Sequence, residues 1–437
     1  MRLNVLGFTV STIMMGAALH STAMAGPSLL TADQKQAQTE ASAAFKDPAI
    51  QTARAAAIKR YESAPPAQLP DGKSTLSAAV DEAVYGTLLA LSNDPVHPGV
   101  IWSQSLPYQF GGNQIPGTRY GGDDPDRIYR AIAVDPAGHY EIHGKRLPGA
   151  SLDFSFEAIS GPALWGKARA VLPAKDVDVA SDGTFVITAD SSPTDGRRNH
   201  LQLPAGAANI LVRDTLNDWS TQLPNELSVQ RIDQGAASAG GQGSVVQRAP
   251  VEIQKSIDES LNFIAGVWKN PPNHLFPVVR GLGDGVKGGI VAVNRFHLEA
   301  DEALVITLDP LHAKYVGIEV TDPWLRSADY AKRSTSLNAS QATTNADGTL
   351  TYVLSAKDPG VHNWLDSAGL HDGILLSRWE IFPGEVQADK AVRAVRVVKS
   401  ANLAGALPQG GSRVDASQRQ QWLSERTKSY EHRLGLE

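Results

Sequence analysis

The chain has 437 residues, a formal net charge of −6 at pH 7, 20% charged residues and no cysteine. The acidic balance excludes a protein that binds nucleic acid or an anionic membrane through bulk electrostatic attraction. The lack of cysteine excludes a disulfide framework, thiol chemistry and thiolate metal sites. A chain of this length exceeds one ordinary core, so we expect two domains with connecting segments.

Residues 1–25 have the pattern of a secretory signal peptide. Arg2 gives a basic start, residues 5–19 are mostly apolar, and the small residues Ala23 and Ala25 stand just before Gly26. This pattern predicts export and cleavage after Ala25, which makes the mature protein periplasmic or secreted. The apolar run is short for a bilayer and lacks a basic flank, so we expect no stable membrane span.

Residues 26–92 form a predicted N-terminal helical region. From Ser74 to Ser92, apolar residues recur at three- and four-residue spacing, which predicts an amphipathic helix capped by Ser74 or Ser77. Residues 93–126 then form a long loop rich in proline, glycine and aromatic residues. A loop of this length and composition is typical of a functional surface, although its aromatic residues could also plug the edge of a core.

Residues 93–233 are predicted to form a first β lobe, because short alternating runs are separated by turn signals about every ten residues, a spacing typical of sandwiches and barrels. A linker and a central helix follow in residues 234–289, with the helix expected from Pro250 to Trp268. Residues 290–398 give the second β lobe, and residues 399–437 a tail with a helix capped by Asp415 or Ser417.

The second half of the chain repeats a pattern of the first half. The stretch from Ala346 to Pro383 has Asp-Gly turn chemistry, an apolar run, a polar loop and a second apolar run, and Ser181 to Trp219 has the same order. At a nearly constant offset, Asp182, Gly183, Asn199, Leu201, Gly206 and Arg213 match Asp347, Gly348, Asn363, Leu365, Gly369 and Arg378. The predicted fold is therefore mainly β with peripheral helices, in two related β-sandwich-like lobes joined by a helix-containing linker.

The second-lobe motifs resemble a known family. The stretches DEALVITLDPLHAKYVGIEVTDPW and GVHNWLDSAGLHDGILLSRWEIFPG look like the signature of domain-of-unknown-function family 1214. The matching positions are Asp309, Pro310, Tyr315, Asp322 to Trp324, Asn363, Trp364, Arg378 and Trp379. The resemblance implies a β-rich fold in an exported or cytosolic bacterial protein. It implies no reaction, because the family name assigns none.

The polar loop of the second lobe holds the candidate catalytic residues. His362 or His371 could act as a general base with Asp366 nearby, and Arg378 could hold an anion or hydroxyl groups. Asn and Asp in wide hairpins also commonly satisfy backbone turns. Because the first-lobe counterpart keeps an Asn and an Arg but lacks the carboxylate, the duplicated pair could instead tie the loop to a strand end.

Candidate ligand-binding residues are polar or aromatic side chains near the same motifs. They are Asn363, Trp364, Trp324, Tyr315 and Arg213. Aromatic rings in loops beside polar anchors are typical of sandwiches that bind sugars or flat apolar molecules. The wider aromatic set is Trp102, Tyr108, Phe110, Trp268, Trp324, Trp364 and Trp379, for each of which core packing is the ordinary alternative.

Metal and glycosidase chemistry have weaker support in the sequence. His139 and His143 are four residues apart on one side of a predicted strand, but no third ligand has telling spacing, so we expect no metal and no cofactor. Paired carboxylates could cleave glycosides only at a suitable separation, which sequence does not measure. The candidates are Glu299, Asp301, Glu319, Asp322 and Asp366.

These observations favour an exported protein that binds a small organic or carbohydrate-like ligand in a cleft lined by loops. One alternative is a hydrolase or lyase that uses His362 or His371 with Arg378. The other is a structural or partner-binding module. No nucleic-acid partner is expected, and the sequence leaves the oligomeric state open.

Overall fold

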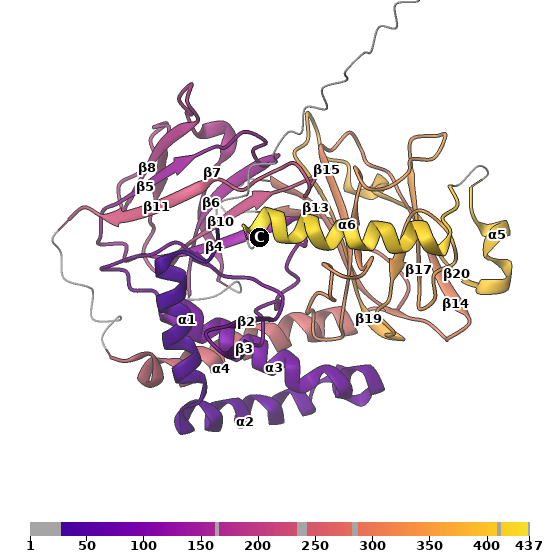
Figure 1. Cartoon of the computed structure of the whole chain (residues 1–437), viewed down its shortest axis with the longest axis horizontal. Coiled ribbons are helices and arrows are strands. Elements are labelled where there is room, and N and C mark those ends of the chain that lie inside the picture. The colour runs from indigo at the N-terminus through magenta and orange to yellow at the C-terminus, as the bar shows by residue number, and fades with distance from the viewer. Residues whose placement is uncertain (1–27, 162–165, 234–242, 282–286, 409–411, 436–437) are drawn as a thin grey trace, which may run out of the picture.

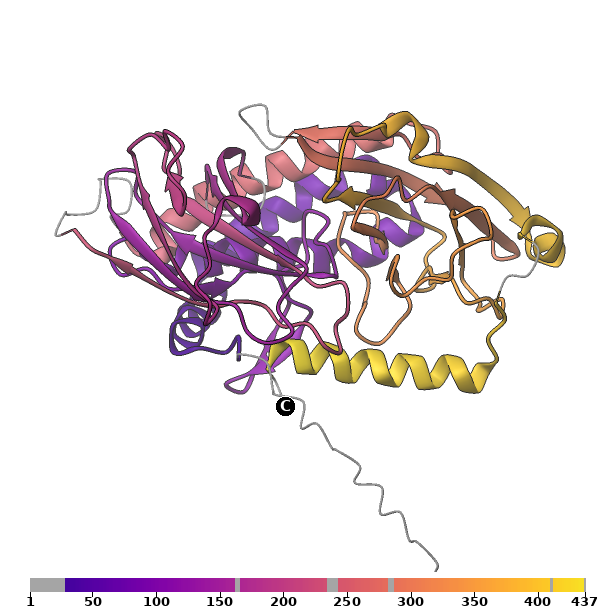
Figure 2. The same ribbon diagram turned by 90° about the horizontal axis from the view of Figure 1, so that it is seen from above.

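The computed structural model describes residues 28–161, 166–233, 243–281, 287–408 and 412–435. Two β lobes lie side by side, helices α1 to α4 form a layer beneath them, and helix α6 crosses from the second lobe to the junction between the lobes (Figure 1 and Figure 2). The predicted signal peptide and most of the predicted low-complexity linker lie outside the described residues. Within the described residues, no helix is long and apolar enough to cross a membrane.

Four helices make the layer beneath the lobes: α1 (Ala32–Phe45), α2 (Pro48–Glu62), α3 (Pro70–Leu91) and α4 (Val245–Trp268). Helix α3 begins at Pro70 after Leu69, so the expected caps at Ser74 and Ser77 were wrong; proline suits the first helical position because the amide there needs no partner. Helix α4 also begins before the expected Pro250, because Ser244 forms a capping box with the side chain of residue 247.

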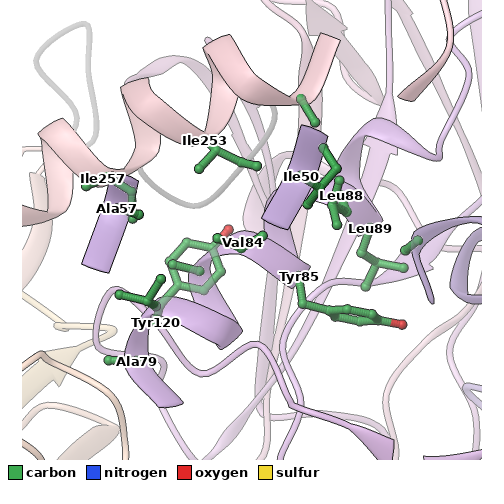
Figure 3. Close-up of a cluster of buried hydrophobic side chains, with 14 of the residues drawn as sticks. Ile50, Ala57, Ala79, Val84, Tyr85, Leu88, Leu89, Tyr120, Ile253 and Ile257 are labelled. Carbon is green, nitrogen blue, oxygen red and sulfur yellow. The ribbon is translucent and has the colours of Figure 1, made fainter. Parts of the chain in front are cut away.

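The helical layer has an apolar core of its own. Ile253 and Ile257 of α4 face Ile50 and Ala57 of α2, and Val84 and other α3 residues complete the cluster (Figure 3). The apolar stripe of α4 therefore packs inward, as apolar stripes on helices usually do. The helices that the sequence placed at the surface thus share a core with the central helix.

Each lobe is a sandwich of a five-stranded and a four-stranded sheet. In the first lobe the five-stranded sheet has the order β1 (Ile101–Trp102), β4 (Arg127–Ala133), β10 (Asn209–Thr215), β6 (Asp153–Ile159) and β7 (Ala168–Pro173). The four-stranded sheet has the order β11 (Glu226–Arg231), β5 (Tyr140–Lys145), β8 (Thr184–Asp190) and β9 (His200–Gln202). In the second lobe the five-stranded sheet has the order β12 (Pro277–Gly281), β13 (Lys287–His297), β19 (Asp372–Glu380), β15 (Tyr315–Thr321) and β16 (Ser336–Asn338). The four-stranded sheet has the order β20 (Val392–Lys399), β14 (Glu302–Leu308), β17 (Leu350–Ser355) and β18 (Trp364–Asp366). A separate hairpin joins β2 (Tyr108–Phe110) to β3 (Asn113–Ile115), and the tail holds α5 (Leu403–Ala406) and α6 (Ala416–Leu434), which Asp415 caps as expected.

The two lobes have the same strand order and register, which confirms the duplication. Strands β8 and β9 pair in parallel, and so do β17 and β18, whereas the other named pairs are antiparallel. Arg213 lies opposite Ser155 in the first lobe, and Arg378 lies opposite Gly317 in the second. A shift of one residue would turn every side chain to the other face, so matched register requires matched hydrophobic patterns.

The polar loop is fastened in the same way in both lobes. In the second lobe, Asn363 accepts a hydrogen bond from the amide of Thr343 at 2.7 Å and donates to the carbonyl oxygens of Thr343 and Thr351 at 2.8 and 3.0 Å. In the first lobe, Asn199 donates to two carbonyl oxygens at 3.0 Å, one of them on Asp178. The duplicated asparagine therefore joins the loop to a strand edge, which was the structural alternative for this residue.

We expect Asn363→Ala to lower the free energy of unfolding by about 2–4 kcal/mol, because it leaves buried backbone groups without partners. Asn199→Ala is the matched control, and it should cost less because water can reach the groups that Asn199 serves. Chemical denaturation of both variants measures the difference. Equal losses, or a larger loss for Asn199→Ala, would contradict this account.

Candidate functional site

A pocket of about 540 Å³ lies beside helix α6, where groups from both lobes meet. The first lobe contributes the loop around Trp219, the second lobe contributes His362 and Leu337, and the helix contributes Trp422 among others. The complete lining is Asp218, Trp219, Ser220, Ser334, Leu337, Gln341, His362, Arg419, Trp422, Leu423, Glu425, Arg426, Lys428 and Ser429. We refer to this space as the α6 pocket.

His362 is held as a neutral imidazole at one side of the α6 pocket. Its Nδ1 lies 3.1 Å from Oδ1 of Asn363, which already accepts from the amide of Thr343, so Nδ1 must carry the proton. Burial lowers the pKa of His362, the bond with Asn363 opposes this shift, and the charge of Arg419 adds to it. The unprotonated Nε2 is therefore available as a hydrogen-bond acceptor or a base.

Aromatic rings and arginines form the rest of the wall. The ring of His362 packs edge-on against Trp422, with centroids 4.6 Å apart. Arg419 lies over the Trp422 ring at 5.4 Å and pairs with Asp358, and Arg426 lies over Trp219 at 4.2 Å. Both guanidinium groups also donate to backbone carbonyl oxygens of the second lobe, so they shape the pocket rather than offering a free cation.

The two lobes meet through a second feature, a buried network of charged side chains. The hydroxyl oxygen of Tyr315 lies 2.8 Å from Oδ1 of Asp124 and 2.9 Å from Oδ2 of Asp126. Arg378 of β19 pairs with Glu319 on the neighbouring strand. Every one of these side chains is buried. Arg378 is therefore buried and hydrogen-bonded within its lobe.

Besides the bonds of Tyr315, three contacts carry this network across the lobe boundary. Arg378 donates to the carbonyl oxygen of Gly122 in the first-lobe loop, and its Nε lies 3.9 Å from Asp124. Arg127 of β4 pairs with Glu380 of β19 and lies 3.5 Å from Asp124. Because a buried charge without a partner is costly, these pairs fix how one lobe sits against the other.

The two aspartates beneath Tyr315 differ in their titration. Burial would raise the pKa of Asp124, but Arg378 and Arg127 lower it below its ordinary value. Burial and the neighbouring Asp124 raise the pKa of Asp126 to about 6. Two carboxylates so close cannot both ionise easily, so the arginines decide which one keeps the charge.

The remaining catalytic candidates lie apart from one another. Asp366 pairs with Arg333 at 2.8 Å. Nδ1 of His371 lies 2.8 Å from the carbonyl oxygen of Leu298, and its backbone amide donates to Asp71 at the start of α3. Of His362, Asp366, His371 and Arg378, only His362 lines the α6 pocket. The loop residues that are close in sequence therefore do not converge on one site.

The ligand-binding candidates mostly serve the scaffold. Nε1 of Trp364 donates to the carbonyl oxygen of Ser355 at 3.2 Å, and Nε1 of Trp324 donates to that of Gly72 at 2.8 Å. Both indoles are buried, whereas Arg213 is partly exposed and pairs with Glu157 just as Arg378 pairs with its glutamate. Tyr315 lies in the network, and Asn363 fastens the loop, as described above.

Three of the glycosidase candidates are engaged by arginines. Asp322 pairs with Arg326, and the partners of Glu319 and Asp366 are given above. His139 and His143 each lie near a carboxylate, at 3.6 Å from Asp190 and 3.3 Å from Glu141. In the part of the chain that the structure describes, no group of three or more His, Cys, Asp or Glu residues could hold a metal ion.

Sequence reasoning missed the residues that build both features. Trp219, Trp422 and Arg419 were not singled out, since they lie far apart in sequence and meet only when α6 folds back. The acidic run from Asp123 to Asp126 was a usable signal, because it ends a long loop directly before a strand. Its role depends on Tyr315, which is supplied by the other lobe.

Comparisons with known proteins give the fold and no activity. No protein-family model and no curated protein matches the chain. The chain is similar to the crystal structure of an uncharacterised protein from Burkholderia cenocepacia, with 24% identity over 84% of this chain and 99% of that one and a TM-score of 0.66. A protein from Vibrio parahaemolyticus is 9% identical over 74% and 98% of the two chains, with a TM-score of 0.41. The Burkholderia structure shares the mainly β fold, and the resemblance to family 1214 stays a prediction.

Replacing Arg378 tests the buried network. We expect Arg378→Ala to lower the free energy of unfolding by about 3–5 kcal/mol, because it leaves Glu319 buried without a partner. Arg393→Ala is the control, since Arg393 forms an exposed pair with Asp309 whose loss should cost about 0–1 kcal/mol. Denaturant titration compares the two variants. An unchanged midpoint for Arg378→Ala would contradict the network.

The pH dependence of stability tests the two aspartates. Since the folded-state pKa of Asp126 is raised to about 6, its contribution is fully present below its unfolded pKa of about 4 and is lost as pH rises through about 6. The free energy of unfolding of Asp126→Asn, relative to that of the natural protein, should therefore rise by about 1–3 kcal/mol from pH 4.5 to pH 7.5.

Asp124→Asn should behave in the opposite way. The lowered pKa of Asp124 means that its contribution is present above its unfolded pKa and disappears as pH falls, so its loss at pH 7.5 leaves Arg127 and Arg378 short of a counter-charge. Melting temperatures of both variants at the two pH values give the comparison. A similar loss from both substitutions at pH 7.5 would refute unequal titration.

Proposed function

We propose that the protein is an exported binding protein that holds a small organic molecule, carbohydrate-like in its ring and hydroxyl groups, in the α6 pocket. The observation that carries this proposal is the meeting of His362 and Trp422 in a space of about 540 Å³ that is built by both lobes and the helix. That volume falls within the range of about 300–1,000 Å³ that is usual for small-ligand sites.

The lining suits a ring with hydroxyl groups. Trp422 and Leu337 offer apolar surface, and the free Nε2 of His362 can accept a hydrogen bond from a hydroxyl. Gln341 and Ser334 add polar groups at the same wall. A saccharide presents apolar C–H faces and hydroxyl edges, which is the combination that such a wall complements.

Binding is favoured over catalysis because reactive groups do not converge in this pocket. Burial alone would raise the pKa of Asp218, but hydrogen bonds from Ser220 and Thr221 lower it, so this carboxylate is a poor proton donor. Arg378, the anchor of the hydrolase or lyase alternative, lies in the network between the lobes. Acidic and hydroxyl groups do line the pocket, but the side chain of His362 hydrogen-bonds to Asn363 and to none of them, so no acid or nucleophile is held against it.

A ligand screen with matched variants tests the proposal. The probes are neutral monosaccharides, uronic acids and aromatic hydroxy acids, followed by thermal shift and then calorimetry on any compound that raises the melting temperature. Trp422→Ala and His362→Ala should each weaken binding about tenfold or more, which corresponds to about 1.4 kcal/mol. Trp268→Ala is the control, because this half-buried indole ends α4 away from the pocket.

The results separate the proposal from its rivals. Selective binding that both pocket variants weaken and the control keeps supports the α6 pocket. A lack of saturable binding by every class of probe, or binding that both variants retain, would overturn it. Product formation during the same incubations, monitored by chromatography, would replace binding with catalysis.

A further inference from the structure

A second cleft of about 650 Å³ lies on the first lobe, and its lining shares no residue with the α6 pocket. It is bounded by the first turns of α4, the end of α3, and the ends of β4 and β10 where they leave the sheet. Its walls are mainly small, because Ala133, Ala207 and Ala208 lie on the lobe side. Two polar side chains in this lining each have one buried atom without a hydrogen-bond partner.

The first is Arg248, in the first turns of α4. One terminal nitrogen donates to the carbonyl oxygen of Leu91 at 2.8 Å, which ties the side chain to the end of α3. Its Nε is buried and has no hydrogen-bond acceptor, and no carboxylate within 4.0 Å pairs with the guanidinium among the described residues. By contrast, Lys255 further along the same helix already pairs with Glu252 at 2.7 Å.

The second is Asn209, at the start of β10. Its side chain is almost fully buried, with 4% of the residue exposed, and its amide nitrogen donates to the carbonyl oxygen of Gly161 at 2.9 Å. That bond fixes which end of the amide is oxygen. The remaining Oδ1 receives no hydrogen bond from the described residues. This buried acceptor is therefore open to a hydrogen bond from a bound molecule.

We propose that this cleft binds a small hydroxy- or amino-carboxylate. The guanidinium of Arg248 would take the carboxylate, for which it is the best-matched side chain in geometry and charge. The hydroxyl or ammonium group of the ligand would donate to Oδ1 of Asn209. The alanines on the lobe side leave room for a short ligand side chain and favour small acids over bulky ones.

Calorimetry on the full chain tests this site with glycolate, L-lactate, glycine and L-serine as probes. Propionate has a carboxylate without a second polar group that donates, and sulfate has negative charge without a hydrogen-bond donor. We expect at least one of the four acids to bind saturably and about fivefold or more tighter than propionate and sulfate, because only the four acids both accept from Arg248 and donate to Asn209.

Arg248→Gln should weaken that binding about tenfold or more, because it removes the positive charge and the paired donors of the guanidinium. Arg60→Gln is the control, since Arg60 pairs with Asp258 of the same helix and does not line the cleft. Equal melting temperatures of the two variants verify folding. Binding that survives Arg248→Gln, sulfate or propionate binding as tightly as the four acids, or no saturable binding of any of the four, would overturn the proposal.

Discussion

The desolvated guanidinium of Arg378 is the interaction on which the arrangement of the two lobes depends. Its pairing with Glu319 stays inside the second lobe, but its remaining donors reach Gly122 and Asp124 of the first. A charge removed from water must keep all its partners, because each missing one costs several kcal/mol. The lobes therefore have one low-energy arrangement, and this arrangement determines the shape of the α6 pocket.

Duplication supplied two similar sandwiches, and the connecting segments made them different. Both lobes keep the arginine–glutamate pair on matching strands, but Arg213 stays partly exposed while Arg378 is buried under the first-lobe loop. Helix α6 extends the asymmetry, because its start holds the second-lobe loop through Arg419 and its end inserts Arg433 beside Trp219 of the first lobe. Both proposed binding sites thus lie where unrepeated segments cover repeated ones.

The two clefts follow from that principle. Each lies beside a helix, one along α6 and the other at the first turns of α4. In the α6 pocket the gap is lined by indole rings and a neutral imidazole, which suits hydroxylated rings. In the second cleft, beside the first turns of α4, alanines lie around Arg248 and Asn209, which suits small acids. The two sites would then bind two chemically distinct ligands.

The sequence by itself determined the two β lobes, their internal repeat and the central helix, because strand alternation, Asp-Gly turns and helical stripes are local patterns. It also indicated a structural role for Asn363, because the matching Asn199 stands in a loop that has no carboxylate at the position of Asp366. Only the tertiary structure decided that His362 leaves its loop neighbours to join Trp422, and that Tyr315 joins Asp124 from the other lobe. These contacts join residues far apart in the chain, and they depend on how whole lobes dock, which no local pattern encodes.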